Sequence, residues 1–223
     1  MMPKILIIGD SSSLSREELS FNKTYYAIMK NKKNYILEMN ATANNTSRNI
    51  AIKLESFLLY GYSPDVVILN YGIVDVYPRP YPNKIHKLLS CVGLLQYIDT
   101  FLKKTKLYYK FGDFFNFKEV SLDEFRKYSE NIVVKLLKKE VKQIIIIGII
   151  KPYKVLLKSK KVKEDIELYN ASFKKLAEDN EEISYIDIYN DSSEDFTIWD
   201  GYHYSEQASK YLTMKIEKII KYD

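Results

Sequence analysis

The chain has 223 residues, of which 46% are hydrophobic and 28% charged, values that are typical of a globular protein and argue against intrinsic disorder. The net charge of +5 comes from 34 basic and 29 acidic residues, a mild excess spread over scattered lysines, so we expect no nucleic-acid partner. The single cysteine, Cys91, excludes an internal disulfide and a cysteine-based zinc site. It lies in an apolar run, and we predict a buried, inert thiol.

No apolar run approaches the roughly 20 residues that a membrane span requires, and the first residues lead directly into a short strand pattern without the features of a signal peptide. We therefore expect a cytoplasmic protein without a membrane span. Neither a repeat nor a linker interrupts the chain, which predicts one domain over residues 1–223. The oligomeric state is left open.

In chain order, short apolar runs alternate with longer helical patterns. The runs predict strands at 4–8, 35–39, 65–70, 143–150 and 183–188. The longer patterns predict helices at 15–30, 47–60, 84–106, 121–140, 163–180 and 205–221. Two of these helices begin with a Ser-x-x-Glu capping box, at Ser15 and at Ser121, and Gly61 is expected to end the helix 47–60.

Two segments do not follow this alternation. Three prolines between residues 77 and 82 exclude a helix or a central strand there. Residues 108–120 are rich in aromatic side chains, and we expect an irregular insertion at the edge of the domain.

Five strands with helical crossovers predict an α/β fold, a three-layer α/β/α sandwich around a five-stranded parallel sheet. Ligands of such sheets bind outside the carboxyl ends of the strands. Ser11 follows the first strand, Asn44 the second and Gly72 the third, and the loop with Asp200 and His203 follows the fifth. All are therefore expected at one edge.

The polar residues at this edge indicate nucleophilic catalysis. Serine needs a base to remove its proton, and the base needs a carboxylate that holds its tautomer. Of the two histidines, only His203 has an Asp three residues before it, so we predict Ser11 as nucleophile, His203 as base and Asp200 as its partner. Read one at a time, each motif is more often a capped turn or a solvent-exposed pair than a catalytic group. His86 stands among lysines and is expected at the surface.

Taken together, Gly9-Asp10-Ser11, Gly72-Ile73-Val74-Asp75 and Asp200-Gly201-Tyr202-His203 resemble the blocks of the SGNH hydrolases, also called GDSL esterases. The resemblance spans nearly the whole chain. It implies a flavodoxin-like α/β/α sandwich and a triad of Ser11, Asp200 and His203. The form Gly-Ile-Val-Asp, with Pro78-Arg79 after it, resembles a subgroup associated with bacterial polysaccharide gene sets.

Two positions depart from the family pattern. The second block, residues 40–46, has no Gly to supply an oxyanion N–H, and Val74 stands where the third block has an Asn donor. One lost oxyanion donor costs about 10²–10³ in rate. Asn44 is the best substitute, since Asn tolerates left-handed backbone. The candidate oxyanion and substrate-binding residues are Asn44, Asn70, Gly72 and Arg79.

The sequence thus favours a serine esterase that hydrolyses a small acyl ester, an O-acetyl group on a carbohydrate being the expected substrate. An O-acyltransferase with the same triad and a binding module with a degraded oxyanion hole are the alternatives. No metal site is expected, because the supply of Cys and His ligands is thin. No cofactor is expected either, and the partner is a small-molecule or glycan ester.

Overall fold

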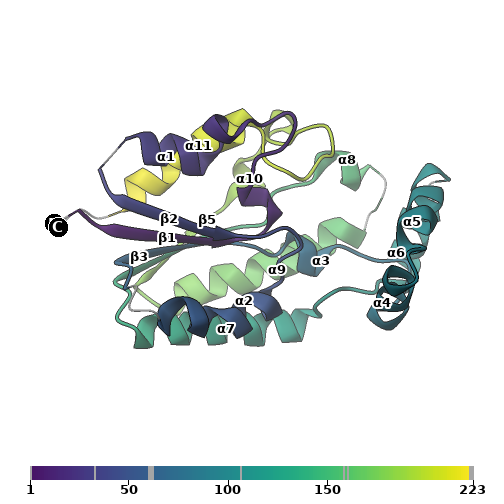
Figure 1. The fold of residues 1–223 in the computed structure, drawn as a ribbon, viewed down its shortest axis with the longest axis horizontal. Coiled ribbons are helices and arrows are strands. Elements are labelled where there is room, and N and C mark those ends of the chain that lie inside the picture. Colours follow the sequence, from purple (N-terminus) through teal and green to yellow (C-terminus); the bar gives the residue numbers. More distant parts are fainter. Residues whose placement is uncertain are drawn as a thin grey trace.

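The computed structural model describes residues 2–32, 34–59, 63–105, 107–157, 159 and 161–220. Its centre is a parallel sheet of five strands in the order β2-β1-β3-β4-β5 (Figure 1). This confirms the predicted α/β class and the five-stranded parallel sheet flanked by helices. The strands are β1 (Lys4–Gly9), β2 (Ile36–Ala41), β3 (Val66–Asn70), β4 (Gln143–Ile147) and β5 (Ile183–Ile186).

Alternation along the buried strands directs side chains to both faces of the sheet. In β1, Ile5 and Ile7 belong to the core beneath α1 (Tyr25–Asn31) and α11 (Glu206–Ile219). Leu6 and Ile8 belong to the opposite core, beneath α2 (Ser47–Leu59), α7 (Leu122–Lys138) and α9 (Lys161–Glu178). Figure 1 shows these two helical layers above and below the sheet. Because both faces are covered, the central strands read as continuous apolar runs.

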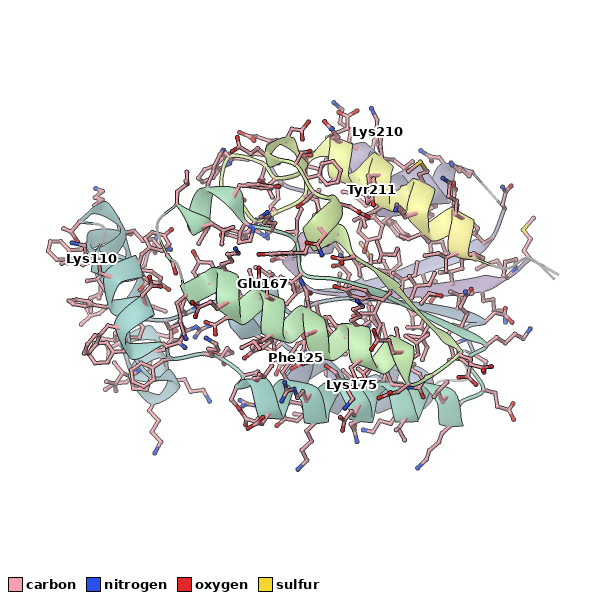
Figure 2. The ribbon with its side chains drawn as sticks, turned by 180° about the vertical axis from the view of Figure 1, so that it is seen from behind. Lys110, Phe125, Glu167, Lys175, Lys210 and Tyr211 are labelled. Carbon is pink, nitrogen blue, oxygen red and sulfur yellow. The ribbon has the colours of Figure 1, made fainter. Side chains whose placement is uncertain are left out.

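The second core contains a cluster of aromatic rings between α7 and α9. Phe125, labelled in Figure 2, is fully buried. Its ring centroid lies 4.6 Å from that of Tyr169 and 4.9 Å from that of Phe173. The capping box predicted at Ser121 is present and begins α7, with Glu124 bonding back to the Ser121 N–H. The cap predicted at Gly61 lies outside the described residues.

The helix predicted at 15–30 is wrong in its first half. Thr24, not Ser15, caps α1, since its Oγ1 accepts the Ala27 N–H. Residues 16–19 form a tight turn instead, in which Arg16 and Leu19 exchange two backbone hydrogen bonds. The Glu18 carboxylate accepts from the Trp199 N–H, 181 residues away, and so is unavailable to cap a helix at Ser15.

The segment after β3 also differs from the prediction. The helix expected at 84–106 is divided into α4 (Asn83–Cys91) and α5 (Leu95–Lys104), with Gly93 at a φ of 71° between them. The stretch expected to be irregular contains α6 (Leu107–Phe115). These three helices stand apart from the two layers (Figure 1). Cys91 lies on α4 and is exposed, so the prediction of a buried thiol is wrong.

Shorter elements connect these parts. They are the 3-10 turns η1 (Ser11–Ser13), η2 (Phe21–Lys23) and η3 (Glu194–Phe196), and the helices α3 (Ile73–Val76), α8 (Tyr153–Leu156) and α10 (Ile188–Asp191). Asn170 on α9 holds the chain after β4, because its side chain bonds both the N–H and the carbonyl of Ile149. Among the described residues, no helix is long and apolar enough to cross a bilayer.

Candidate active site

Ser11 reaches the carboxyl edge of the sheet because β1 ends in a glycine. A Cβ on Gly9 would lie 2.5 Å from Ser13 Oγ and 2.9 Å from the Asn70 carbonyl, so only Gly lets the turn close. Asp10 caps the turn η1, since its Oδ1 accepts the Ser12 N–H at 2.8 Å. Ser11 is the first residue of this turn, so its own N–H has no acceptor within it. Its side chain is 7% exposed.

His203 is positioned by the loop between η3 and α11. The Asp200 carboxylate organises this loop, because Oδ1 accepts the N–H groups of Tyr202 and His203, both at 3.1 Å. Its other oxygen, Oδ2, lies 2.6 Å from His203 Nδ1. Burial acts to raise the pKa of Asp200, but these hydrogen bonds outweigh burial, and its pKa lies below the usual range. Asp200 is therefore an ionised acceptor that favours a proton on Nδ1.

The imidazole of His203 faces the side chain of Ser11, from the opposite end of the sequence. His203 Nε2 lies 3.0 Å from Ser11 Oγ, although the two residues are 192 positions apart. With the proton held on Nδ1, Nε2 carries the lone pair that a general base needs. The structure thus brings together the serine, imidazole and carboxylate that the sequence singles out, within hydrogen-bonding distance of one another.

Asn70 lies beneath this site in a buried polar network and is not directed at Ser11. Its Nδ2 donates to Ser13 Oγ at 2.8 Å and to the Tyr25 hydroxyl at 3.3 Å, and its Oδ1 accepts from the Tyr204 hydroxyl at 2.9 Å. These bonds hold the turn η1, the start of α1 and the His203 loop to the end of β3. Asn70 thus supports the site from below.

Two further carboxyl groups are buried near the serine. Burial raises the pKa of Asp10 to about 6, against the lowering effect of its hydrogen bond with the Ser12 N–H. Its Oδ2 is buried without a well-aligned donor. Asp75 accepts from both the N–H and the hydroxyl of Ser47, at 3.0 and 2.6 Å for Oδ1, and so caps α2. Burial raises its pKa to about 7 despite these bonds.

Gly72 and Asn44 both occupy backbone conformations that most residues avoid. Gly72 begins α3 with a φ of 122°, and a Cβ there would lie 2.8 Å from Ile149 Cδ1. Asn44 has a φ of 57°, the left-handed conformation that Asn tolerates. Its side chain is exposed, whereas Asn45 is buried and donates to the Gly9 carbonyl at 3.1 Å. Val74 is half-buried against the core and offers no side-chain donor.

Arg79 is already engaged by a neighbouring carboxylate. Its Nη1 lies 2.6 Å from Glu119, and its backbone N–H bonds the Phe117 carbonyl at 2.7 Å. The Pro-rich loop is thereby attached to the segment after α6. The charge of Arg79 is neutralised within the protein and is not presented to an incoming anion.

Arg16 is the residue at this site that sequence reasoning missed. Its Nη2 lies 2.9 Å from His203 Nε2, and its Nε is buried without a partner. The Ser15-x-x-Glu18 pattern assigned Arg16 to a helix, so no local signal placed it beside the histidine. Arg16 and His203 line a pocket of about 620 Å³ together with Ser15, Glu17, Ile198, Trp199, Asp200 and Tyr202.

The described residues contain no group of three or more His, Cys, Asp or Glu side chains that could hold a metal ion. The second histidine, His86, is half-buried on α4, with its ring centroid 6.1 Å from that of Tyr81. It takes no part in this arrangement.

No protein-family model matches the chain, and no curated protein matches it. Solved structures do. A catalytic mutant of the acetylxylan esterase Axe2 from Geobacillus stearothermophilus aligns with 99% of this chain and 95% of its own, at a TM-score of 0.63 and 19% identity. The psychrotrophic esterase EstA from Pseudoalteromonas sp. aligns with 96% of this chain and 94% of its own, at a TM-score of 0.61 and 14% identity. A member of the lipolytic protein G-D-S-L family from Veillonella parvula aligns over 97% of both chains, at a TM-score of 0.60 and 12% identity. The chain is therefore similar in fold, over nearly its full length, to lipolytic esterases of the G-D-S-L type.

Proposed function

We propose that this chain is a serine esterase in which Ser11 is the nucleophile, His203 the base and Asp200 the group that orients the base. The observation that carries the proposal is the continuous arrangement of Asp200 Oδ2, the imidazole and Ser11 Oγ, with distances of 2.6 and 3.0 Å. The fold similarity to esterases supports the same reaction class.

In the first half-reaction, Ser11 Oγ forms a bond to the ester carbonyl carbon while its proton moves to His203 Nε2. The tetrahedral species then breaks its bond to the alcohol oxygen, which receives that proton from Nε2. In the second half-reaction, water attacks the acyl-enzyme, Nε2 takes the water's proton, and the proton returns to Ser11 Oγ as the acid leaves. Asp200 stabilises the imidazolium in both halves.

The negative charge on the carbonyl oxygen needs hydrogen-bond donors. The Ser11 N–H is available because Ser11 begins its turn, and the Asn44 N–H is the second donor in this proposal, since its left-handed backbone substitutes for a glycine. The Asn70 side chain is committed to Ser13, Tyr25 and Tyr204, and Val74 has no side-chain donor. We therefore expect a modest rate, because each missing donor costs about 10²–10³.

The proposed substrate is a small acyl ester, an acetyl group on a carbohydrate alcohol. Similarity of fold to an acetylxylan esterase supports this choice, as does a pocket whose rim includes the exposed ring of Trp199 beside His203.

The test is hydrolysis of p-nitrophenyl acetate by the purified protein and by Ser11→Ala. Wild type should release p-nitrophenol and should be labelled by a fluorophosphonate probe, and Ser11→Ala should lose both while keeping its thermal transition. Ser172→Ala, a matched serine variant on α9 outside the site, should keep both. Equal hydrolysis by wild type and Ser11→Ala would remove the proposal.

A further inference from the structure

The guanidinium of Arg16 stands out by its lack of an acidic partner. The chain has four arginines, and three of them form ion pairs, Arg48 with Glu124, Arg79 with Glu119 and Arg126 with Asp123. Among the described residues, Arg16 has no carboxylate within ion-pair distance. Its hydrogen bond goes to a neutral ring nitrogen, His203 Nε2, and its Nε is buried without any partner. A permanent cation therefore lines this pocket without a carboxylate within ion-pair distance.

The contact of Arg16 with His203 competes with the proposed catalytic contact. With the proton on Nδ1, Nε2 has a single lone pair in the ring plane. Two donors share it, Arg16 Nη2 at 2.9 Å and Ser11 Oγ at 3.0 Å. While Arg16 holds this position, Nε2 is a poorer acceptor for the serine proton.

Arg16 also occupies the place of the departing alcohol. During ester cleavage Nε2 hands its proton to the leaving-group oxygen, which must therefore come within hydrogen-bonding distance of Nε2. That space is now held by Nη2. The alcohol part of a substrate must consequently displace the guanidinium and, in doing so, lie directly against it.

The backbone that carries Arg16 is fixed, whereas its side chain has room to move. The turn at 16–19 is closed by two hydrogen bonds of 2.9 and 3.0 Å, and Leu19 is anchored in the core at 1% exposure. The pocket beside the guanidinium is lined by Trp199, a residue that is 63% exposed, and by Tyr202. Glu17 is exposed and lines the same pocket.

We infer that Arg16 recognises an anionic group on the alcohol part of the ester, a carboxylate or a phosphate, and that this contact withdraws the guanidinium from His203 and frees Nε2 to act as the base. The inference rests on the proposed esterase function and deepens it. The substrate class is an acylated acidic saccharide, in which the sugar ring lies against Trp199 and its anionic group bonds the fork of Arg16. Arg16 thereby combines substrate selection with activation of the base.

The test compares acetyl esters that differ in the charge of the alcohol. The three substrates are acetylated methyl glucoside, acetylated methyl glucuronoside and acetylated methyl glucoside 6-phosphate, with acetate release as the readout. Wild type should prefer an anionic ester in kcat/KM. Arg16→Met keeps the length of the side chain but removes charge and donors, and the ratio of anionic to neutral kcat/KM should fall by about 10-fold to 100-fold, the range for a lost charged hydrogen bond. The anionic ester with the larger kcat/KM relative to the neutral ester, the glucuronoside or the 6-phosphate, identifies which anion Arg16 prefers.

Two variants control for indirect effects. Arg16→Lys keeps the charge without the planar fork, so its ratio should lie between those of wild type and Arg16→Met. Arg126→Met, on α7 in the opposite layer, should keep the wild-type ratio. An independent readout uses the Ser11→Ala protein, which binds without turnover. Methyl glucuronoside, but not methyl glucoside, should shift the 15N resonance of His203 Nε2 as its donor leaves.

The outcomes separate this inference from the proposed function. A wild-type ratio near one, or an equal fall for charged and neutral esters in Arg16→Met, would overturn the role of Arg16 while Ser11-dependent hydrolysis stands. Hydrolysis that does not depend on Ser11 would overturn the esterase itself.

Discussion

Replacement of Asp200 by Asn tests whether this carboxylate acts on the imidazole or only caps a turn. Asp200 does two things through different oxygens, since Oδ1 accepts two backbone N–H groups and Oδ2 accepts from His203 Nδ1. Asn has the same shape but only one acceptor oxygen, so it can accept either from the two backbone N–H groups or from His203 Nδ1, but not from both.

The two orientations of the substituted amide set the expected magnitude. If the amide oxygen stays on the backbone, the amide nitrogen donates to Nδ1, the ring proton moves to Nε2, and the base is lost, at a cost of about 10⁴ in kcat. If the amide turns over, it preserves the tautomer but abandons two backbone N–H groups, each at a cost of about 1–3 kcal/mol. That penalty of roughly 2–6 kcal/mol limits the active orientation to about 1 in 30 or fewer molecules. Asp200→Asn should therefore lose between about 30-fold and 10⁴-fold in kcat.

The assay is kcat for p-nitrophenyl acetate, with the rate of fluorophosphonate labelling as a second measure of Ser11 reactivity. Asp195→Asn is the matched control, because Asp195 is exposed in η3, just before the loop of Asp200, and its carboxylate bonds the Ser193 hydroxyl rather than His203 or Ser11. This variant should retain wild-type kcat. A loss of less than about fivefold in a fully folded Asp200→Asn protein would show that the carboxylate does not hold the tautomer.

Two further substitutions test the buried supports of the site. Burial raises the pKa of Asp75 from 3.8 to about 7, so the folded chain keeps a proton that the unfolded chain releases, and the free energy of unfolding should fall as pH rises from about 4 to 7, by up to about 4 kcal/mol. The side chain of Asp75→Asn cannot ionise, so this variant should show a smaller change of unfolding free energy with pH, the remainder being due to Asp10. Chemical denaturation at several pH values measures this change, and equal pH dependence in wild type and variant would contradict the assignment to Asp75. Gly72→Ala should destabilise by roughly 1–3 kcal/mol, because its φ of 122° is strained for Ala and the new methyl meets Ile149 at 2.8 Å. Gly93 also has a positive φ, but a Cβ there would have no atom within 4 Å. Gly93→Ala should therefore lower the free energy of unfolding by less than Gly72→Ala does, and an equal loss would show that the overlap with Ile149 is relieved.

The parts of the fold that could be predicted are those written into local periodicity. The unbroken β-branched run around β4 predicts a strand covered on both faces, and both cores receive its side chains. Capping at Ser121 is a contact between residues three apart, and the Ser-x-x-Glu pattern predicts it correctly there. A local contact of this kind can be read from the sequence where no distant part of the chain binds the same side chains.

The start of α1 shows where local patterns fail. Ser15 and Thr24 are both acceptable caps by residue type, but Thr24 caps α1 and Glu18 bonds the backbone of the distant Trp199 instead of the Ser15 N–H. The irregular segment predicted at 108–120 fails for a related reason, because aromatic residues are compatible with a helix when other helices partly cover them, as in α6.

The sequence by itself determined that Ser11, Gly72 and the loop of Asp200 and His203 meet at one edge, because parallel strands joined by helical crossovers all end on the same side of their sheet. Only the tertiary structure decided what those residues touch. Packing in three dimensions placed Asn70 in a network below the serine, paired Arg79 with Glu119, and brought Arg16 to His203 across 187 positions. Such contacts depend on distances between elements far apart in the chain, and a local pattern of residue types carries no information about those distances.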